Sequence, residues 1–558
     1  MNSLPLAVSD QIGGELPVKT ECLPFSQIPH TTRLFSDFLS YAGDVRRFYP
    51  RSPHFAEWLK QETANIRYER FRRQLVAEIL KRQNQQWGAS PKTFENIARF
   101  RTGALAAVTG QQVGLFGGPL FSIFKALTAV KLADEATAAG VDCVPVFWLA
   151  TEDHDLAEVN NAGLLNGEGS LERLKTPTQG LPDAPVGTVQ FGEDIQAVVE
   201  QACDLLGASE VIHWLRDSYR PGETLGSAFA RLFSRLFADW GVILLDAADP
   251  ELHKISASIY QAVIERAAEI DDALLKRGKE LESAGYHQQV KVTPSSTLLF
   301  TLHNGARVPV HRRPNGSSEA DFLIEEKKLP QSELLRLVSS APHHFSPNVL
   351  LRPVVQDYLL PTLAYTGGSA EVAYFAQGAV VHEALLGRVT PIVPRFSATL
   401  AESKQQRLME RYELKLTDLF RGPEALREIL AGRTLPADLQ SAFDQAALSL
   451  EKSLAAIRES LSHLDATLAD AATRAGSKMQ YQLEHLRASA ARAELRQSEI
   501  LNRHAEQLSH ALYPDKSLQE REVAGVYFVA RYGKELLRQL YGALHTECLD
   551  HQVVSLES

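Results

Sequence analysis

The chain has 558 residues, with 58 Lys and Arg against 68 Asp and Glu and a formal net charge of −10. Hydrophobic residues make up 44% and charged residues 23%, a globular balance that excludes disorder as the main state. The mild acidity argues against binding nucleic acid over a broad face. No apolar run approaches the ~20 residues of a membrane span. No basic segment followed by a long apolar stretch opens the chain, so we expect no secretory signal.

The four cysteines are scattered along the chain and form no CxxC pair. This spacing excludes a zinc ribbon and a disulfide framework. Together with the composition, it predicts a soluble protein of the reducing cytoplasm. The four are Cys22, Cys143, Cys203 and Cys548.

The first recognisable unit is strand, glycine-rich loop, helix, strand. Residues 104–108 predict a short buried strand, and residues 144–150 form an unbroken apolar run typical of a central parallel strand. Between them, Gly118 and Pro119 predict the cap and first residue of a helix. The segment therefore predicts a βαβ unit and an α/β fold class with a parallel sheet.

The loop TGQQVGLFGGP between strand and helix is the first candidate ligand site. Doubly wound sheets bind ligands here, where glycines let the backbone approach an anion and the helix N-terminus offers free N–H groups. The loop is neither GxGxxG nor Walker A. The alternative is a tight turn whose glycines only allow the helix to pack on the strand. The candidate residues are Thr109, Gln111, Gln112, Gly114, Gly117 and Gly118.

The acidic segment after residues 144–150 is the second candidate. Glu152, Asp153, His154 and Asp155 put three carboxylates and an imidazole into four residues. Neighbouring carboxylates favour the charged form of a histidine, which makes His154 a candidate proton carrier. The alternative is a solvated turn with Asp155 as the N-cap of the next helix. A metal site is the weaker interpretation, because no second histidine stands at ligand spacing.

Further along, the chain leaves the sheet twice. Residues 160–190 are rich in Gly, Pro and Asn, and residues 297–312 alternate around Asn304-Gly305, a hairpin signal. We expect inserted subdomains at about 160–225 and 290–345. Between them, residues 241–247 predict a central strand and residues 250–284 a long helix.

Residues 351–377 repeat the pattern of strand, glycine loop and helix, and form the third candidate. Two such loops at one edge of a sheet would open onto a single cleft, where ligands usually bind. The alternative is a structural turn with a helix cap. The candidates here are Gln356, Tyr365, Gly367, Gly368 and Glu371.

The last part of the chain is helical. No Gly or Pro occurs between Pro436 and Gly476 or between Gly476 and Pro514, and apolar residues recur in steps of three and four. This predicts two long helices joined near Ala475-Gly476, as an antiparallel coiled coil that pairs two subunits in a homodimer. The alternative is a two-helix layer packed flat on the core. The aromatic tail after Pro514 is expected to dock back on the core.

Four motifs together resemble the bacillithiol biosynthesis cysteine-adding enzyme family of cysteine ligases. They are TGQQVGLFGGP, PVFWLATEDHDLAEVN, LRPVVQDYLLPTLAYTGGSAEVAYF and PIVPRFSATL, and the resemblance extends over essentially the whole chain. It implies a Rossmann-like parallel-sheet core with inserted connecting subdomains over 1–395, a C-terminal α-helical coiled-coil arm over 396–512 and a closing segment over 513–558. It also implies the last step of bacillithiol synthesis, the joining of cysteine to the amine of glucosaminyl-malate.

On this resemblance we expect the glutamines and glycines of the first loop to hold an anion, Asp153, His154 and Asp155 to manage protons, and the third segment to bind the sugar or a nucleotide. Amide formation is uphill in water, so ATP or ADP with Mg²⁺ is the expected co-substrate, with no tightly bound cofactor. No HxGH or KMSKS-like signature is present. Two rivals remain: a non-catalytic metabolite-binding scaffold and a metal-dependent N-acyl sugar hydrolase.

Overall fold

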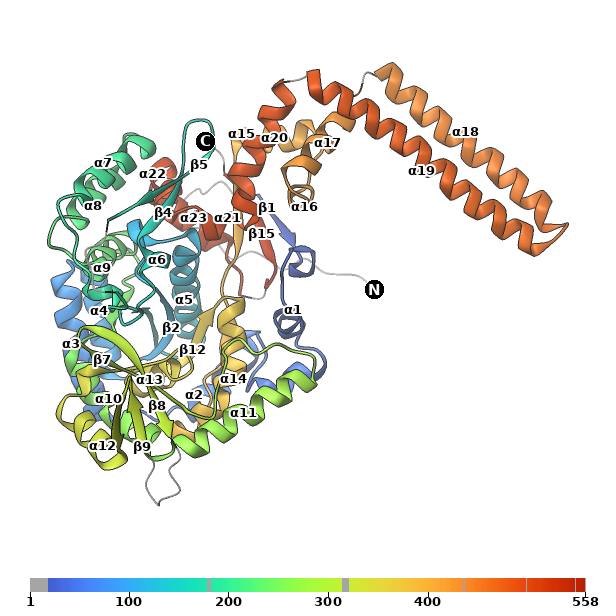
Figure 1. The fold of residues 1–558 in the computed structure, drawn as a ribbon. Helices are drawn as coiled ribbons and strands as arrows, with labels where there is room; N and C mark the ends of the chain where they lie inside the picture. Colours follow the sequence, from blue (N-terminus) through green and yellow to red (C-terminus); the bar gives the residue numbers. More distant parts are fainter. Residues whose placement is uncertain are drawn as a thin grey trace. The chain divides into compact units, whose positions relative to one another are not determined.

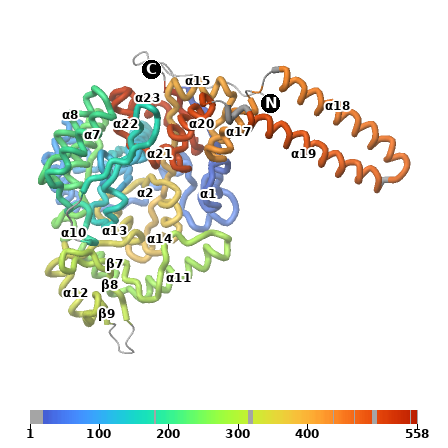
Figure 2. The backbone as a smooth tube through the Cα atoms, turned by 45° about the horizontal axis from the view of Figure 1, so that its top comes forward, coloured from blue at the N-terminus to red at the C-terminus, as the bar shows by residue number. Residues whose placement is uncertain are grey.

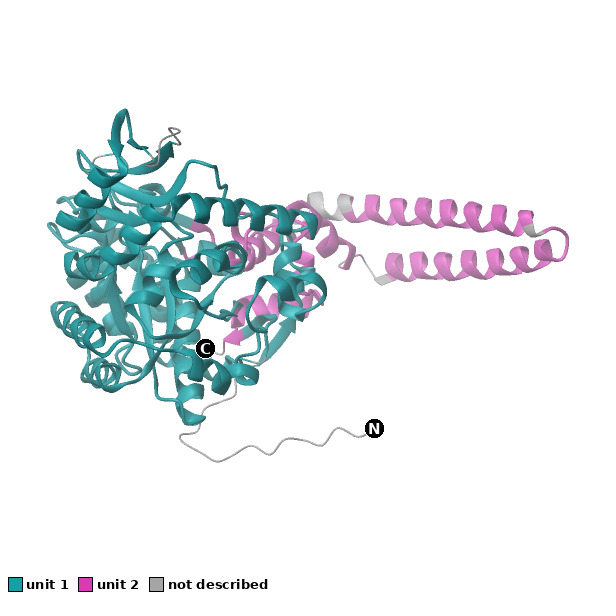
Figure 3. Cartoon of the chain, turned by 90° about the horizontal axis from the view of Figure 1, so that it is seen from below, with its two compact units in different colours: residues 1–164, 172–399, 520–554 teal, residues 165–171, 400–519, 555–558 magenta. Residues whose placement is uncertain are grey.

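The computed structural model describes residues 19–177, 182–313, 321–433, 435, 437–497, 499–546 and 548–556. Two stretches of the expected inserts, 178–181 and 314–320, lie outside the described residues. The chain divides into two compact units (Figure 3). Unit 1 comprises residues 1–164, 172–399 and 520–554, and unit 2 comprises residues 165–171, 400–519 and 555–558.

A five-stranded parallel sheet lies at the centre of unit 1, in the order β13-β12-β2-β3-β6. From β2 the chain adds β3 and β6 on one side, then places β12 and β13 on the other. The order therefore reverses between β2 and β12, the switch point at which doubly wound sheets bind ligands. The strands are β2 (Leu105–Gln111), β3 (Cys143–Leu149), β6 (Ile243–Asp246), β12 (Thr362–Gly367) and β13 (Ile392–Pro394). The predicted α/β class and the three predicted strands are confirmed, but β6, which was predicted as a central strand, lies at the edge of the sheet.

Helices cover both faces of this sheet (Figure 1). All seven residues of β3 are buried, which explains its unbroken apolar run. Val144 and Val146 join the core beneath α3 (Arg70–Gln86) and α10 (Pro250–Glu265), whereas Cys143 joins the core beneath α2 (Phe55–Asn65) and α5 (Leu120–Ala138). Alternate side chains of one strand thus hold two separate helical layers.

The other helices of this part of the chain are α1 (Arg33–Ser40), α4 (Pro91–Thr102), α6 (Leu156–Val159), α7 (Ile195–Leu206), α8 (Glu210–Ser218), α9 (Leu225–Leu236), α11 (Ala267–Ser283), α12 (Gln331–Ser340), α13 (Arg352–Leu359), α14 (Ser369–Leu386), α21 (Gln519–Glu522), α22 (Gly525–Tyr532) and α23 (Glu535–Ala543). Two predicted helices need correction. The single helix over 250–284 is α10 and α11, because Arg266 leaves helical geometry between them. Pro119 is the N-cap of α5, one position earlier than predicted.

A five-stranded antiparallel sheet forms an insert between α11 and α13, in the order β10-β9-β8-β7-β11. Asn304 and Gly305 both have positive φ, as a two-residue hairpin turn requires, and they join the first two strands. The predicted hairpin is therefore confirmed. The strands are β7 (Ser296–His303), β8 (Ala306–Arg313), β9 (Asp321–Ile324), β10 (Lys327–Pro330) and β11 (Phe345–Pro347). The earlier excursion contains the β4 (Asn161–Leu165) and β5 (Leu171–Lys175) pair.

The three remaining strands are β1 (Thr20–Leu23), β14 (Ala398–Glu402) and β15 (His551–Leu556), of which β1 and β15 lie near the ends of the described chain. β1 pairs antiparallel with β15, with Cys22 opposite Gln552 and Leu23 opposite His551. In unit 1 this pairing joins the first described strand to the last.

Unit 2 is helical, and its two longest helices lie side by side (Figures 1 and 2). The turn between them falls at residues 463–465, so the predicted joint near Ala475-Gly476 is wrong. Asp465 accepts a hydrogen bond from the Thr467 N–H and caps the second helix. Gly476 lies within that helix, where a Cβ would come within 2.9 Å of Leu454. The helices are α15 (Ser403–Arg411), α16 (Leu416–Leu419), α17 (Pro423–Arg433), α18 (Ala437–Ser462), α19 (Ala466–Gln497) and α20 (Glu499–Leu512). No helix in the described part of the chain could span a membrane.

Candidate functional site

A cavity of about 470 Å³ lies in unit 1 at the carboxyl ends of β2, β3 and β12. This is the edge of the sheet where the strand order reverses, so the topology alone favours it as the ligand site. The N-terminus of α14, the start of α13 and residue Lys125 of α5 complete the walls. Its charged and amide lining consists of Gln111, Gln112, Lys125, Glu158, Gln289, Arg352, Glu371, Arg395 and Arg521.

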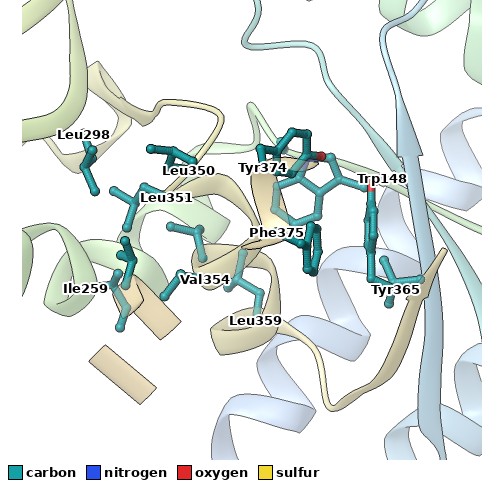
Figure 4. Close-up of a cluster of buried hydrophobic side chains, with 14 of the residues drawn as sticks. Trp148, Ile259, Leu298, Leu350, Leu351, Val354, Leu359, Tyr365, Tyr374 and Phe375 are labelled. Carbon is teal, nitrogen blue, oxygen red and sulfur yellow. The ribbon is translucent and has the colours of Figure 1, made fainter. Parts of the chain in front are cut away.

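Aromatic rings form part of the wall. Figure 4 shows Trp148, Tyr365, Tyr374 and Phe375 gathered together within the hydrophobic core. Tyr365 and Phe375 stack with their ring centroids 4.9 Å apart. Trp148 is 2% exposed, and its indole N–H has no hydrogen-bond partner in the described part of the chain. Because Trp148 also lines the cavity, an acceptor on a bound molecule can satisfy this donor.

Lys125 fastens the two sides of the switch point together. Its ammonium group donates to the Gly110 carbonyl at 2.9 Å and to Gln111 Oε1 at 2.7 Å, both at the end of β2. It also forms an ion pair of 2.9 Å with Glu371 of α14. Burial lowers the pKa of Lys125, and the Glu371 carboxylate opposes this. All three ammonium protons therefore serve the scaffold of the cavity.

The Glu371 carboxylate also has several partners within the walls of the cavity. It accepts hydrogen bonds from the Tyr365 hydroxyl at 2.7 Å and from the Gly368 N–H at 2.6 Å. Burial would raise its pKa, but the Lys125 ammonium and these donors hold the pKa of Glu371 below its usual value. Glu371 is therefore an ionised clamp between the strand and the helix.

Arg352 is a cation of the cavity that forms no ion pair with any described carboxylate. Its guanidinium donates to Gln356 Oε1 at 2.9 Å and to the Tyr374 hydroxyl at 2.8 Å. Among the described residues, no acidic side chain lies within ion-pair distance of it. Gln356 in turn donates to Asp357, which pairs with buried His382 at 3.0 Å. The buried side chains of Gln356, Asp357 and His382 therefore form a hydrogen-bonded series that holds the Arg352 guanidinium in place.

Two further arginines line the same space. Arg395 forms a bidentate pair with Glu520 at 2.6 and 3.1 Å, so its charge is compensated. Arg521 is exposed and forms no ion pair with any described residue. Arg352 and Arg521 are thus the two uncompensated guanidinium groups of the lining. Against them stands one exposed carboxylate, Glu158, so the cavity favours a ligand with more than one negative charge.

The structure divides the residues predicted in the first loop. Gln111 and Gln112 line the cavity. Thr109 instead donates to the Thr366 carbonyl and joins β2 to β12. Gly117 faces Leu232 and Phe233 of α9, and its N–H donates to the Tyr219 hydroxyl.

Gly114 and Gly118 are in close contact with each other, since a Cβ on Gly114 would lie 2.9 Å from the Gly118 Cα. The N–H groups of these two glycines donate within the turn, to Gln112 and Leu115 carbonyls. The glycines therefore allow tight packing of the helix on the strand, and that they hold an anion stays a prediction. The packing alternative explains them, although it does not explain the two glutamines.

The acid–imidazole segment lies beside the cavity and not in its lining. Asp153 accepts a hydrogen bond from Gln112 at 2.7 Å, which links it to the wall. His154 Nδ1 lies 3.1 Å from the Arg307 guanidinium, which can only donate, so Nδ1 accepts and carries no proton in this arrangement. Asp155 is the N-cap of α6, as in the alternative interpretation.

In the third segment, Tyr365, Gly368 and Glu371 line the cavity as predicted. Gln356 is fully buried behind Arg352 and acts through it. Gly367 packs against the Glu371 side chain, and its carbonyl accepts a hydrogen bond from the Arg395 N–H. These two predicted binding residues therefore support the wall without facing the ligand space.

Sequence reasoning assigned no site role to five charged residues of the lining: Lys125, Glu158, Arg352, Arg395 and Arg521. Lys125 carried a signal, because it is a lone charge within the apolar run LFSIFKALTAV. Glu158, Arg352 and Arg395 lie within the motifs that carry the family resemblance, and Arg521 lies outside them, but nothing in their spacing indicated that they face the cavity. The described residues contain no group of three His, Cys, Asp or Glu side chains that could hold a metal ion.

Two family models cover nearly the whole chain. Residues 18–396 match the N-terminal Rossmann-like domain of bacillithiol biosynthesis BshC, and residues 398–556 match its C-terminal coiled-coil domain. The chain belongs to the BshC family. The predicted family, the Rossmann-like core and the coiled-coil domain are thereby confirmed.

Three relatives named "Putative cysteine ligase BshC" show how complete the match is. The chain is 49% identical to the one from Koribacter versatilis over 534 residues, which is 96% of this chain and 99% of the relative. It is 36% identical to the one from Solibacter usitatus, over 96% and 99% of the two chains. It is 33% identical to the one from Salinibacter ruber, over 97% and 100%. These names agree with the prediction of a ligase.

Proposed function

We propose that this protein joins the carboxyl group of cysteine to the amine of glucosaminyl-malate as an amide, the last step of bacillithiol synthesis, in the cytoplasm. The names of its relatives support a cysteine ligase. The observation that carries the choice of acceptor is Arg352, a buried guanidinium of the lining with no carboxylate partner among the described residues.

The malate group has two carboxylates, and the cavity has two uncompensated guanidinium groups. Arg352 is held in place by Gln356 and Tyr374, so it is preorganised to bind one carboxylate. Arg521 supplies the second positive charge at the exposed side. The N-terminus of α14, with Gly368 and Ser369 in the lining, adds its partial positive charge. Anion recognition therefore orients the glucosamine amine in the cavity.

The amine must lose a proton as it attacks the acyl carbon, and a positioned base contributes about 10²–10⁴-fold. We assign this role to Glu158, whose carboxylate lines the cavity. The residue as a whole is exposed, but partial burial of its carboxylate and the nearby Asp155 and Asp153 charges raise the pKa of Glu158, which makes it a better proton acceptor than an ordinary carboxylate. Gln112 donates to both Glu158 and Asp153, and so connects the base to the acid–imidazole segment.

The cysteine carboxylate must be activated before it can react, because forming an amide from a free carboxylate in water is uphill. ATP with Mg²⁺ remains our proposed source of activation. The assay is amide formation from cysteine and glucosaminyl-malate, with and without ATP and Mg²⁺. Product formation that needs no activated donor at all would contradict this part of the proposal.

The decisive test of the acceptor compares Arg352→Met with Arg538→Met, which lies on the surface in pairs with Asp239 and Glu535. Losing a buried charged hydrogen-bond pair costs about 2–4 kcal/mol, so kcat/KM for glucosaminyl-malate should fall ~30- to 1000-fold in Arg352→Met alone. With a glucosamine glycoside that lacks carboxylates, the two variants should react at similar rates. An equal loss with both acceptors would show that Arg352 does not bind malate.

We also propose that the coiled coil pairs two copies of the chain. The support is a set of exposed apolar side chains on α18, on α19 and in the turn between them, which a lone hairpin would leave in water. Their exposed fractions run from 44% to 78%, and they are Leu448, Ile457, Leu464, Leu468, Met479, Tyr481 and Leu486.

A further inference from the structure

Two of the four cysteines, separated by most of the chain, lie in contact. Cys22 Sγ is 3.4 Å from Cys548 Sγ in unit 1. Cys22 is exposed and Cys548 is partly exposed. A disulfide needs its sulfurs at about 2.05 Å, so a closure of little more than 1 Å would join them. The fold has therefore placed two accessible thiols within bonding reach.

The other two cysteines differ from this pair in that they are buried and have no second thiol beside them among the described residues. Cys143 is buried in β3, and burial raises its pKa to about 12. Cys203 is buried in α7, and burial raises its pKa as well. Neither contacts another thiol among the described residues. Oxidation chemistry in this chain should therefore concentrate on Cys22 and Cys548.

The pair sits where β1 meets β15. Cys22 lies in β1 opposite Gln552, and its neighbour Leu23 lies opposite His551. Cys548 precedes β15 by three residues. A bond between the sulfurs would therefore fix the first described strand to the last one, and would prevent the edge strand β1 from leaving on its own.

Strand β15 also supports the cavity. His551 is fully buried, with its ring nitrogens 2.7 Å from Ser397 Oγ and 2.9 Å from Thr399 Oγ1. Ser397 donates to Glu520, and Glu520 holds Arg395 of the lining. The segment that the thiols would lock is thus connected through two residues, Ser397 and Glu520, to an arginine of the candidate site.

We propose that Cys22 and Cys548 form a reversible dithiol–disulfide site that reacts with low-molecular-weight disulfides and locks β1 onto β15. One thiolate attacks a sulfur of the small disulfide, forms a mixed disulfide and releases the first small thiol. The other cysteine, after losing its proton, attacks the mixed disulfide and releases the second small thiol. Overall, two cysteine thiols are oxidised to one disulfide, and one small disulfide is reduced to two thiols.

The contact between the thiols also sets the pH at which the site reacts. The hydrogen bond with Cys548 raises the pKa of Cys22 to about 11, so little Cys22 thiolate exists at neutral pH. Because the thiolate is the nucleophile, the exchange should be slow at pH 7 and accelerate as the pH rises. A site of this kind responds to a sustained excess of disulfide and ignores a brief one.

The test uses the full chain and glutathione disulfide as the probe. After incubation, intact mass should fall by two hydrogens with no glutathione retained, and peptide mapping should link Cys22 to Cys548. Cys22→Ser should instead retain one glutathione on Cys548, whereas the control Cys203→Ser should still form the internal bond. If both thiols stay reduced, or if glutathione persists on the native chain, the site does not exist.

A second measurement tests the locking role. The native chain in its oxidised form should melt at least about 4 °C higher than in its reduced form, and dithiothreitol should reverse the shift. Cys22→Ser treated in the same way should show no shift. A bond that forms and leaves the melting temperature unchanged or lower would overturn the lock. Neither measurement depends on the proposed ligase activity.

Discussion

The Lys125–Glu371 pair offers a sharp test of how the candidate site is held together. Lys125 is 4% exposed and bridges β2 to α14 through three contacts of 2.7–2.9 Å. Lys125→Met keeps the length and apolar stem of the side chain but removes the charge. The Glu371 carboxylate would then keep the Tyr365 hydroxyl and the Gly368 N–H, with no cation beside it in a buried position.

An uncompensated buried charge costs about 3–5 kcal/mol of unfolding free energy, which is the loss we expect for Lys125→Met. Glu371→Gln alone should cost a similar amount, since it leaves the ammonium unpaired. The double variant should lose less than the sum of the two, because neither charge remains. The difference between this loss and the sum of the two single losses is the coupling free energy of Lys125 and Glu371.

The assay is urea unfolding followed by tryptophan fluorescence. All five tryptophans lie in unit 1, so the signal reports the unit that contains the pair and not the helical arm. Lys131→Met on the same helix is the matched control. Among the residues that the structure describes, Lys131 contacts Tyr541 through a cation–π interaction, worth about 1 kcal/mol or less, and forms no ion pair. If Lys125→Met lost no more than this control, or if the two single losses simply added, the clamp would be refuted.

Three further predictions concern titration and assembly. Burial raises the pKa of Glu152 from 4.5 to about 8, so between these pH values the folded chain keeps a proton that the unfolded chain releases. The free energy of unfolding should therefore fall as the pH rises from 4.5 to 8. In urea titrations at a series of pH values, Glu152→Gln should show a weaker dependence on pH over this range. Burial opposes ionisation of Asp357, but the contact with His382 holds the pKa of Asp357 below its ordinary 3.8. The ionised carboxylate therefore stabilises the folded chain above pH 3.8, and this stabilisation is lost as the pH falls below it. By the same titration, Asp357→Asn should lower the free energy of unfolding by about 3 kcal/mol at pH 7. On acidification below pH 4, the free energy of unfolding should fall less in this variant than in the native chain. If the coiled coil forms a dimer, Ile457→Glu should halve the mass measured by light scattering, whereas Arg458→Glu next to it should not; an unchanged mass in Ile457→Glu would contradict that interface.

Much of the framework was predictable because it depends on local patterns. The unbroken apolar run of β3 reflects burial on both faces, and the Asn304-Gly305 turn reflects the positive φ that those residues tolerate. The heptad spacing predicted two long helices. It misplaced the turn between them, because the sequence does not distinguish a glycine that ends a helix from one that lies inside a helix. Gly476 is of the second kind, and it lets Leu454 approach the helix.

The candidate site was predictable only where residues follow strand ends. Gln111, Gln112, Tyr365 and Gly368 reach the cavity because parallel strands end at one edge of the sheet. The sequence could not show that Gly117 donates to Tyr219 and faces α9, since that depends on a helix about a hundred residues away.

The sequence by itself determined the family, the parallel strands and the helical arm, because each rests on neighbouring residues or on a shared motif. Tertiary structure alone decided that Lys125 clamps β2 to α14, that Arg352 remains without a carboxylate partner, and that Cys22 meets Cys548 across 526 positions. The physical reason is that charge compensation and thiol contact depend on distances in space. Folding sets those distances by packing the whole core, and no local spacing encodes them.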